Sequence, residues 1–172
     1  TNIHSFIGGA ENSRIAGGAA GIVGGERNKV LQDLGFVAGG ANNTSNAISA
    51  VIVGGASNTV TDNDAFIGGG VSNTVSGYRA GIVAGETNEA SGYFSFLGGG
   101  FSNRAYSFAE AVFGHHVTTY TPTSTFGISP TDRLFVVGNG TDALNPANAL
   151  TILKNGNTSI GDDAPGAYKL KI

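Results

Sequence analysis

Few side chains in this sequence could perform catalysis, and they are scattered along it. The carboxylates to consider are those of Asp62, Asp64, Glu86, Glu89, Glu110, Asp162 and Asp163. Two carboxylates at a suitable separation could hydrolyse a glycosidic bond, and Asp64 and Glu110 would be neutralised first to test such an activity. The sequence contains no cysteine, which excludes a thiol nucleophile and a thiolate metal site.

Two adjacent histidines, His115 and His116, follow the regular part of the sequence. If three chains met at one axis, six imidazoles could hold a metal ion or an anion there. A polar turn that closes the repeat explains the pair more simply, because no other residues with metal-ligand spacing accompany it. We therefore predict no cofactor and no resident metal.

Two further sets of side chains recur every 15 residues and could contact a ligand. An aromatic side chain recurs at Tyr78, Tyr93 and Phe108. A threonine recurs at Thr44, Thr59 and Thr74. The aromatic set could stack on sugar rings, or pack on a neighbouring chain or on its own corner. The threonine set is typical of an ice-binding face, but it is one residue wide and stops at Glu89 and Arg104.

These recurring positions belong to a repeat that covers residues 1–118. Its most regular feature is an asparagine at Asn12, Asn28, Asn43, Asn58, Asn73, Asn88 and Asn103, with a first step of 16 residues and later steps of 15. A glycine stands three residues before each asparagine, and a large apolar residue stands six before it. An eighth copy begins at Ala111 but has no asparagine at position 118.

A unit of 15 residues is too short for a helical repeat and suits one turn of a narrow β-solenoid. Such a turn contains two short strands and two tight corners, and the glycines would provide positive φ or close approach of the backbone. Successive turns would stack the asparagines into a structural ladder about 4.8 Å apart. The predicted ladder comprises Asn28, Asn43, Asn58, Asn73, Asn88 and Asn103.

The strand before each glycine corner is apolar on both faces. One face would fill the solenoid interior, and the other would be polar if it met water. That second face instead alternates large and small apolar residues, a pattern that lets two facing layers interdigitate. We therefore predict that it lies at a contact between copies of the chain. The interface candidates are Phe36, Val51, Val53, Phe66, Val83, Phe96 and Phe113.

Composition narrows the possible partners. The chain has 172 residues, of which 40% are hydrophobic and only 12% are charged, so it is not intrinsically disordered. A net charge of −3 without any cluster of Lys or Arg argues against nucleic acid. No apolar run is long enough for direct membrane insertion.

The repeat resembles the heads of YadA-like trimeric adhesins. The resemblance is carried by the motif Ala-x-Ile-x-Gly-Gly-x-x-Asn, present at residues 50–58 and 65–73, and it covers residues 1–118. The family repeat is usually one residue shorter, so this unit is a variant or an analogue of it. The resemblance implies a left-handed β-roll, a homotrimer, an extracellular setting and adhesion.

The remaining residues lack the 15-residue period. Residues 119–132 contain Pro122 and Pro130 and are interpreted as a linker or irregular cap. Within 133–172, strands are expected at 134–137, 150–154, 158–160 and 168–172, with a hairpin turn at Asn155-Gly156. The stretch 148–172 resembles a connector of phage tail-fibre and bacterial surface proteins, which often precedes a chaperone that assembles the trimer.

The sequence thus predicts an all-β chain: a left-handed parallel β-roll or β-solenoid of 15-residue repeats, a linker and a small β cap. We expect no enzyme but a structural and adhesive segment of a homotrimeric fibre, in a phage tail fibre or a bacterial surface appendage. Its partner would be a cell-surface glycan or protein receptor. The alternative is a solenoid that binds a repetitive ligand, either glycan or ice.

Overall fold

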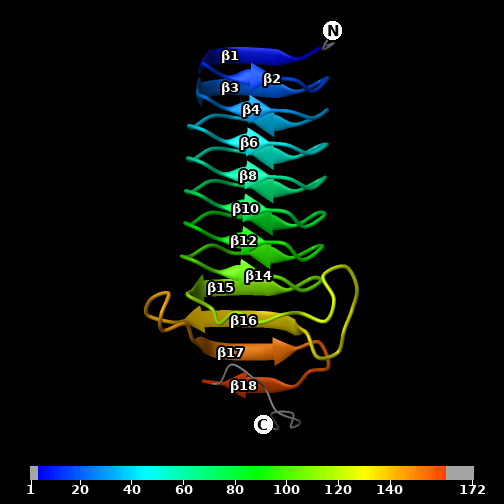
Figure 1. Ribbon diagram of the computed structural model, residues 1–172, viewed down its shortest axis with the longest axis vertical. Helices are drawn as coiled ribbons and strands as arrows, with labels where there is room; N and C mark the ends of the chain where they lie inside the picture. The colour runs from blue at the N-terminus through cyan, green and yellow to red at the C-terminus, as the bar shows by residue number, and fades with distance from the viewer. Residues whose placement is uncertain (1–3, 162–172) are drawn as a thin grey trace.

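The computed structural model describes residues 4–161 as a rod of stacked β-strands (Figure 1). The first sheet contains β1 (Phe6–Glu11), β3 (Gly21–Glu26), β5 (Phe36–Val37), β7 (Val51–Ile52), β9 (Phe66–Ile67), β11 (Gly81–Ile82), β13 (Phe96–Leu97), β15 (Ala111–His115), β16 (Arg133–Asn139), β17 (Asn148–Leu153) and β18 (Thr158–Ile160). The second contains β2 (Arg14–Ile15), β4 (Lys29–Val30), β6 (Thr44–Ser45), β8 (Thr59–Val60), β10 (Thr74–Val75), β12 (Glu89–Ala90) and β14 (Arg104–Ala105).

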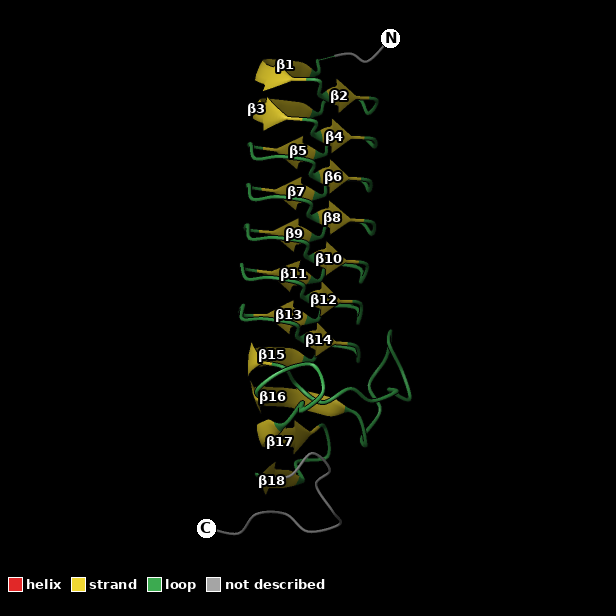
Figure 2. Ribbon diagram, turned by 60° about the vertical axis from the view of Figure 1, so that its left-hand side comes forward, coloured by secondary structure: helices red, strands yellow, loops and turns green. Residues whose placement is uncertain are grey.

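The chain alternates between the two sheets, so each repeat makes one turn of a parallel β-solenoid (Figure 2). From β1 to β15, paired residues of neighbouring strands in each sheet are 15 positions apart, as are Phe66 and Gly81, and Thr59 and Thr74. The expected all-β solenoid with a 15-residue unit is therefore confirmed, and it continues through β15.

The core lies between the two sheets and consists of stacked columns of like residues. The first sheet contributes Ile22, Val37, Ile52, Ile67, Ile82, Leu97 and Val112, all fully buried. The second sheet contributes Val30, Val60, Val75, Ala90 and Ala105, which are also fully buried. Small residues such as Ala50 and Ala65 precede the first strand of their turn and allow the sheets to approach closely. Each large side chain buried in this way contributes about 1.5–3 kcal/mol.

The glycine corner is tight because successive turns meet there at backbone distance. Gly55 has a φ of 85°, and a Cβ atom at this position would lie 2.0 Å from the carbonyl oxygen of Gly70. Such an atom would also lie 2.7 Å from Nδ2 of Asn58. Only glycine satisfies both the positive φ and the close approach, which explains why it recurs three residues before each asparagine.

The asparagines form a continuous hydrogen-bonded ladder in the interior. Nδ2 of Asn58 donates to the carbonyl oxygen of Gly54 in its own turn (3.1 Å) and to that of Gly70 in the next turn (2.9 Å). Its Oδ1 accepts a hydrogen bond from the backbone N–H of Asn73 at 3.0 Å. The six predicted ladder residues are all buried and repeat this pattern. One amide thus satisfies the corner of its own turn and joins it to its neighbours.

Strand pairing in the first turn corrects the alignment of the internal repeats with one another. The first step is 15 residues and not 16, because β1 pairs with β3 through Phe6–Gly21 and Ile7–Ile22. Ser13, not Asn12, occupies the ladder position, and its Oγ accepts the backbone N–H of Asn28 at 3.0 Å. Five paired residues in β1 hold this register, and the serine hydroxyl replaces the missing amide oxygen.

The last turn is one residue shorter than the others. Phe101 bridges to His115, only 14 residues later, and the backbone N–H of Val117 donates to Oδ1 of Asn103 at 3.3 Å. A valine therefore ends the ladder, because it offers no side-chain amide for another turn.

The cap continues the first sheet. Strand β16 pairs in parallel with β15, and β17 and β18 follow in antiparallel order. The expected hairpin at Asn155-Gly156 is confirmed by the pairing of Leu150 with Ile160. The strand expected at 168–172 lies outside the described residues.

The ladder generates a stability prediction. Replacing Asn73 with alanine removes the hydrogen bonds from its Nδ2 to the carbonyl oxygens of Gly69 and Gly85. It also removes the hydrogen bond that its Oδ1 accepts from the buried backbone N–H of Asn88. We expect a loss of roughly 3 kcal/mol, measured from chemical denaturation at the midpoint of unfolding. Asn46→Ala is the control, because Asn46 is exposed and outside the ladder. Equal midpoints for the two variants would contradict a structural role of the ladder.

Candidate functional site

The outward face of the first sheet carries an apolar stripe along the rod. We define this stripe by Phe6, Val23, Phe36, Val51, Val53, Phe66, Val83, Phe96 and Phe113, continued on β16 by Phe135 and Val137. The side chains of Phe6, Phe66 and Phe96 are 60%, 41% and 41% exposed. All seven interface candidates from the sequence lie on this one face. In a single chain the stripe is an extended apolar surface without cover.

Large and small residues alternate across the stripe in two columns. The first column is Phe6, Gly21, Phe36, Val51, Phe66, Gly81, Phe96 and Ala111, and the second is Gly8, Val23, Ala38, Val53, Gly68, Val83, Gly98 and Phe113. A turn with phenylalanine in the first column has glycine or alanine in the second. The corrected first turn also belongs to the pattern, with Phe6 in the first column and Gly8 in the second. The ring of Phe113 also contacts Phe96 and Phe135, with centroids 5.9 and 5.7 Å apart.

The corner opposite the glycines carries the aromatic set predicted from the sequence. The ring centroids of Tyr78 and Tyr93 are 5.7 Å apart. Phe94, which the sequence analysis missed, packs edge-on against both Tyr78 (5.8 Å) and Phe108 (5.6 Å). The guanidinium of Arg79 lies 4.8 Å from the Tyr78 ring centre. These rings therefore pack mainly on one another, although Tyr93 and Phe94 remain 37% and 44% exposed.

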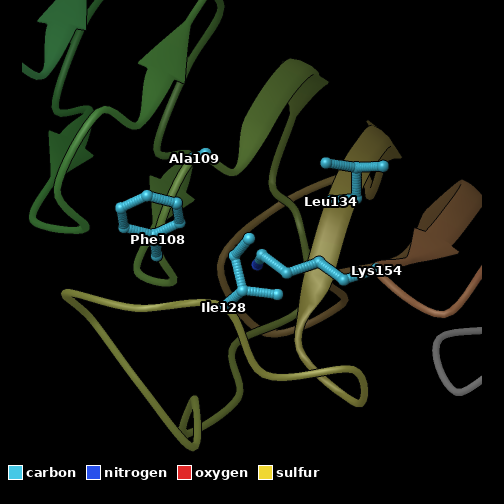
Figure 3. A pocket seen from close by; sticks show the side chains of 5 residues that line it. All are labelled: Phe108, Ala109, Ile128, Leu134 and Lys154. Atoms are coloured by element: carbon cyan, nitrogen blue, oxygen red, sulfur yellow. The ribbon is translucent and has the colours of Figure 1, made fainter.

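The linker between β15 and β16 packs against this aromatic corner. The backbone N–H groups of Tyr93 and Phe108 donate to the carbonyl oxygens of Thr125 (2.8 Å) and Ser124 (3.3 Å). A small cavity of about 200 Å³ lies beside Phe108 and is otherwise lined by Ala109, Ile128, Leu134 and Lys154 (Figure 3). In Figure 3 the Lys154 side chain extends between Phe108, Ile128 and Leu134.

The Lys154 amine is already used in the fold. Nζ donates to Ser107 Oγ at 2.7 Å and to the carbonyl oxygen of Arg133 at 2.6 Å. Burial lowers the pKa of this amine, while the negative charge of Glu110 opposes the shift. Because its hydrogen bonds tie the cap to the last turn, Lys154 serves the junction between the two parts.

Glu110 is a fully buried acid. It occupies the position at which earlier turns have a small core residue, such as Ala50 and Ala65. Its Oε2 accepts the backbone N–H groups of Tyr106 and Ser107, both at 2.9 Å, and the hydroxyl of Tyr120 at 3.3 Å. Its Oε1 and the nearby core hydroxyl of Ser95 are both buried without a hydrogen-bond partner. Burial raises the pKa of the Glu110 carboxyl despite these hydrogen bonds and the positive charges of Arg133 and Lys154.

Within residues 4–161, the other acids considered as catalytic form ion pairs or lie on the surface. Asp64 pairs with Arg79 at 3.3 Å, and Glu89 lies 3.7 Å from Arg104 and accepts the Tyr106 hydroxyl at 3.1 Å. Asp62 caps the backbone N–H of Asn63 in a local turn. Asp162 and Asp163 lie outside the described residues.

The two histidines lie at the junction with the cap. Their ring centroids are 6.2 Å apart, and Nδ1 of His115 lies 2.6 Å from the carbonyl oxygen of Gly140. Among residues 4–161, no group of three or more His, Cys, Asp or Glu side chains could hold a metal ion. The described part of the chain also has no helix that is long and apolar enough to cross a membrane.

The threonine set lies on the outward face of the second sheet. Thr44, Thr59 and Thr74 pair in register on β6, β8 and β10, and all three are half-buried. Lys29 precedes them and Glu89 follows them in the same column. This face is therefore polar, whereas the equivalent face of the first sheet is apolar.

No model of a known protein family matches the chain, and no curated protein matches it significantly.

The buried Glu110 generates a pH prediction. The pKa of the Glu110 carboxyl is higher in the folded chain than in the unfolded chain, where it is about 4.3. The stability contributed by the protonated carboxyl is therefore fully present below the unfolded-state pKa and is lost as the pH rises through the folded-state pKa. We expect Glu110→Gln to be more stable than the wild type at pH of about 8, by a few degrees in Tm, and to lose this advantage at pH of about 4.

Thermal unfolding followed across this pH range checks the effect. Glu86→Gln is the control, because Glu86 is an exposed acid. A constant difference between Glu110→Gln and the wild type at all pH values would contradict the assignment.

Proposed function

We propose that this chain is a non-catalytic, structural and adhesive segment of a homotrimeric fibre. The observation that carries the proposal is the apolar stripe. The outward face of the first sheet is apolar along the rod, whereas the outward face of the second sheet is polar. An extended exposed apolar surface of this kind marks a site of protein–protein contact or ligand binding. The large–small alternation supports a second copy of the same chain as the cover.

The two columns fit each other in a parallel assembly. When copies are related by rotation about an axis along the rod, the first column of one faces the second column of its neighbour at the same height. Phe66 would then meet Gly68 of the neighbouring chain, and Val83 would meet Gly81 of that chain. Large residues would face small ones in nearly every turn, which allows dense packing without a shift between the rods.

The YadA-like motif and the connector-like C-terminal segment support threefold symmetry and a fibre. The resemblance places such a protein outside the cell, in a virion fibre or a surface appendage. A ladder, a closed core and a repetitive surface provide rigidity, which suits a part that spaces or presents a receptor-binding region. The ion pairs and the burial of the candidate acids favour a structural role over catalysis.

The mass of the assembly tests this proposal. Light scattering of the full chain is expected to give three times 17.2 kDa. Phe66→Asp would place three carboxylates in the centre of the interface, so we expect it to yield monomers. Thr59→Asp is the matched control, because Thr59 is also the first residue of a two-residue strand but faces outward from the second sheet. We expect this variant to remain trimeric.

A monomeric wild type would contradict the trimer, and dissociation of both variants would show that the charge acts through folding and not through the stripe. Circular dichroism of each variant distinguishes a folded monomer from an unfolded chain.

The alternative function is the binding of a repetitive ligand by a single solenoid. The exposed rings of Tyr93 and Phe94 favour a glycan over ice as that ligand, since the threonine column is only three turns long. A Tyr93→Ala variant with unchanged mass but reduced retention on a glycan surface would support this alternative.

A further inference from the structure

A second cavity lies where the last solenoid turn meets the cap. It has a volume of about 290 Å³. Ser102, Arg104 and His116 of the last turn line it, together with Val117, Thr119 and Pro146. We call it the junction pocket. Three of these residues come from the end of the array, and the loop between β16 and β17 closes the other side, so the pocket exists only because the repeat stops here.

The backbone of His116 is held in place from both sides. Its backbone N–H donates to the carbonyl oxygen of Phe101, and its own carbonyl oxygen accepts the N–H of Ala147, both at 3.0 Å. The residue has a φ of 48°, and its ring centre lies 5.0 Å from that of Phe101. The backbone is therefore fixed by the turn above and by the cap loop, which presents the ring to the pocket.

The guanidinium of Arg104 is the strongest charge in the pocket. It lies 3.7 Å from Glu89 and 6.0 Å from the ring centre of Tyr106. The same Glu89 oxygen accepts the Tyr106 hydroxyl, so this carboxylate is shared and lies on the array side of Arg104. The side chain of Arg104 remains 47% exposed. Its planar group thus has donors available for a further acceptor.

These groups together fit one class of ligand. A guanidinium binds a carboxylate through two parallel hydrogen bonds, and the Ser102 and Thr119 hydroxyls can bond to the hydroxyls of a sugar. Ala143 and Pro146, which also line the pocket and are exposed, offer an apolar wall for the C–H face of the ring. The volume lies just below the range of drug-sized sites, which suits a single sugar unit. The carboxylate of Asp142, on the neighbouring loop, does not line the pocket, and it accepts hydrogen bonds from the side chain of Asn145 and the backbone N–H of Leu144.

We propose that the junction pocket binds a carboxylate-bearing monosaccharide unit, such as a terminal uronic acid, with Arg104 as the carboxylate-binding residue. This inference rests on the proposed adhesive function and names the class of ligand that the adhesive segment binds. One chain forms the whole pocket. Because Arg104 belongs to the second sheet, assembly through the apolar stripe leaves the pocket open.

Titration of the full chain with methyl glucuronide tests the proposal, with saturation-transfer NMR and calorimetry as readouts. Methyl glucoside, which lacks the carboxylate, is the ligand control. We expect saturable binding of the glucuronide alone, and a loss of affinity of at least about tenfold in Arg104→Gln. Arg79→Gln is the matched variant, because Arg79 also pairs with an acid one turn away but lies at the aromatic corner. It should bind like the wild type.

A second variant, Thr119→Val, removes an exposed hydroxyl with little effect on folding and should weaken binding of the glucuronide. Three results would overturn the proposal: no saturable binding by the wild type, equal binding by Arg104→Gln and the wild type, or equal affinity for inorganic phosphate and the glucuronide. The last result would mean an anion site without recognition of sugar. A trimer that fails to bind the glucuronide refutes only this inference, and a monomer that binds it refutes only the assembly.

Discussion

The fold depends on a single side-chain amide in each turn. The amide of Asn58 joins its own corner to the next one, so every turn must contain the same number of residues between one asparagine and the next. The same contacts require glycine at Gly55, since a side chain there would collide with Gly70 and with the amide itself. Strands of two residues would form a weak sheet in isolation. The ladder supplies the register that such short strands cannot provide.

A fixed register has a consequence for the surface. Because each residue stacks on its equivalent in the next turn, any side-chain preference at one position becomes a column along the rod. The second sheet uses its outward column for Thr44, Thr59 and charged residues, whereas the first sheet uses its own for Phe36 and Phe66. Both sheets have the same geometry, so the solenoid itself does not require an apolar outer face. The apolar stripe is therefore a property of this sequence and not of the solenoid fold.

The sequence predicts the parts of the structure that repeat. The period, the two strands of each turn, the buried ladder and the hairpin at Asn155-Gly156 all follow from local patterns. In the first turn the repeat pattern predicts Asn12 as the ladder residue, because Asn12 has suitable glycine and apolar neighbours. Only strand pairing shows that Ser13 takes its place. Phe94 was missed for a different reason. It occupies the left-handed corner position, from which its ring reaches sideways to Tyr78 and Phe108 of adjacent turns.

The junction with the cap could not be predicted, because it joins residues far apart in the chain. Ser107, Arg133 and Lys154 meet there, and their separations of 21 to 47 residues follow no period.

The end of the array is also where a specific site is physically easiest to build. Within the repeat, equivalent positions have nearly the same backbone surroundings, so a surface built there extends over several turns. Such a surface suits assembly along a length, where many equal contacts add up. Recognition of a single small ligand requires a place that occurs once per chain. The shortened last turn provides it, by ending the ladder at Val117 and bringing His116 and Arg104 against a loop of the cap. Assembly and recognition can therefore occupy different surfaces of one rod without competing for the same residues.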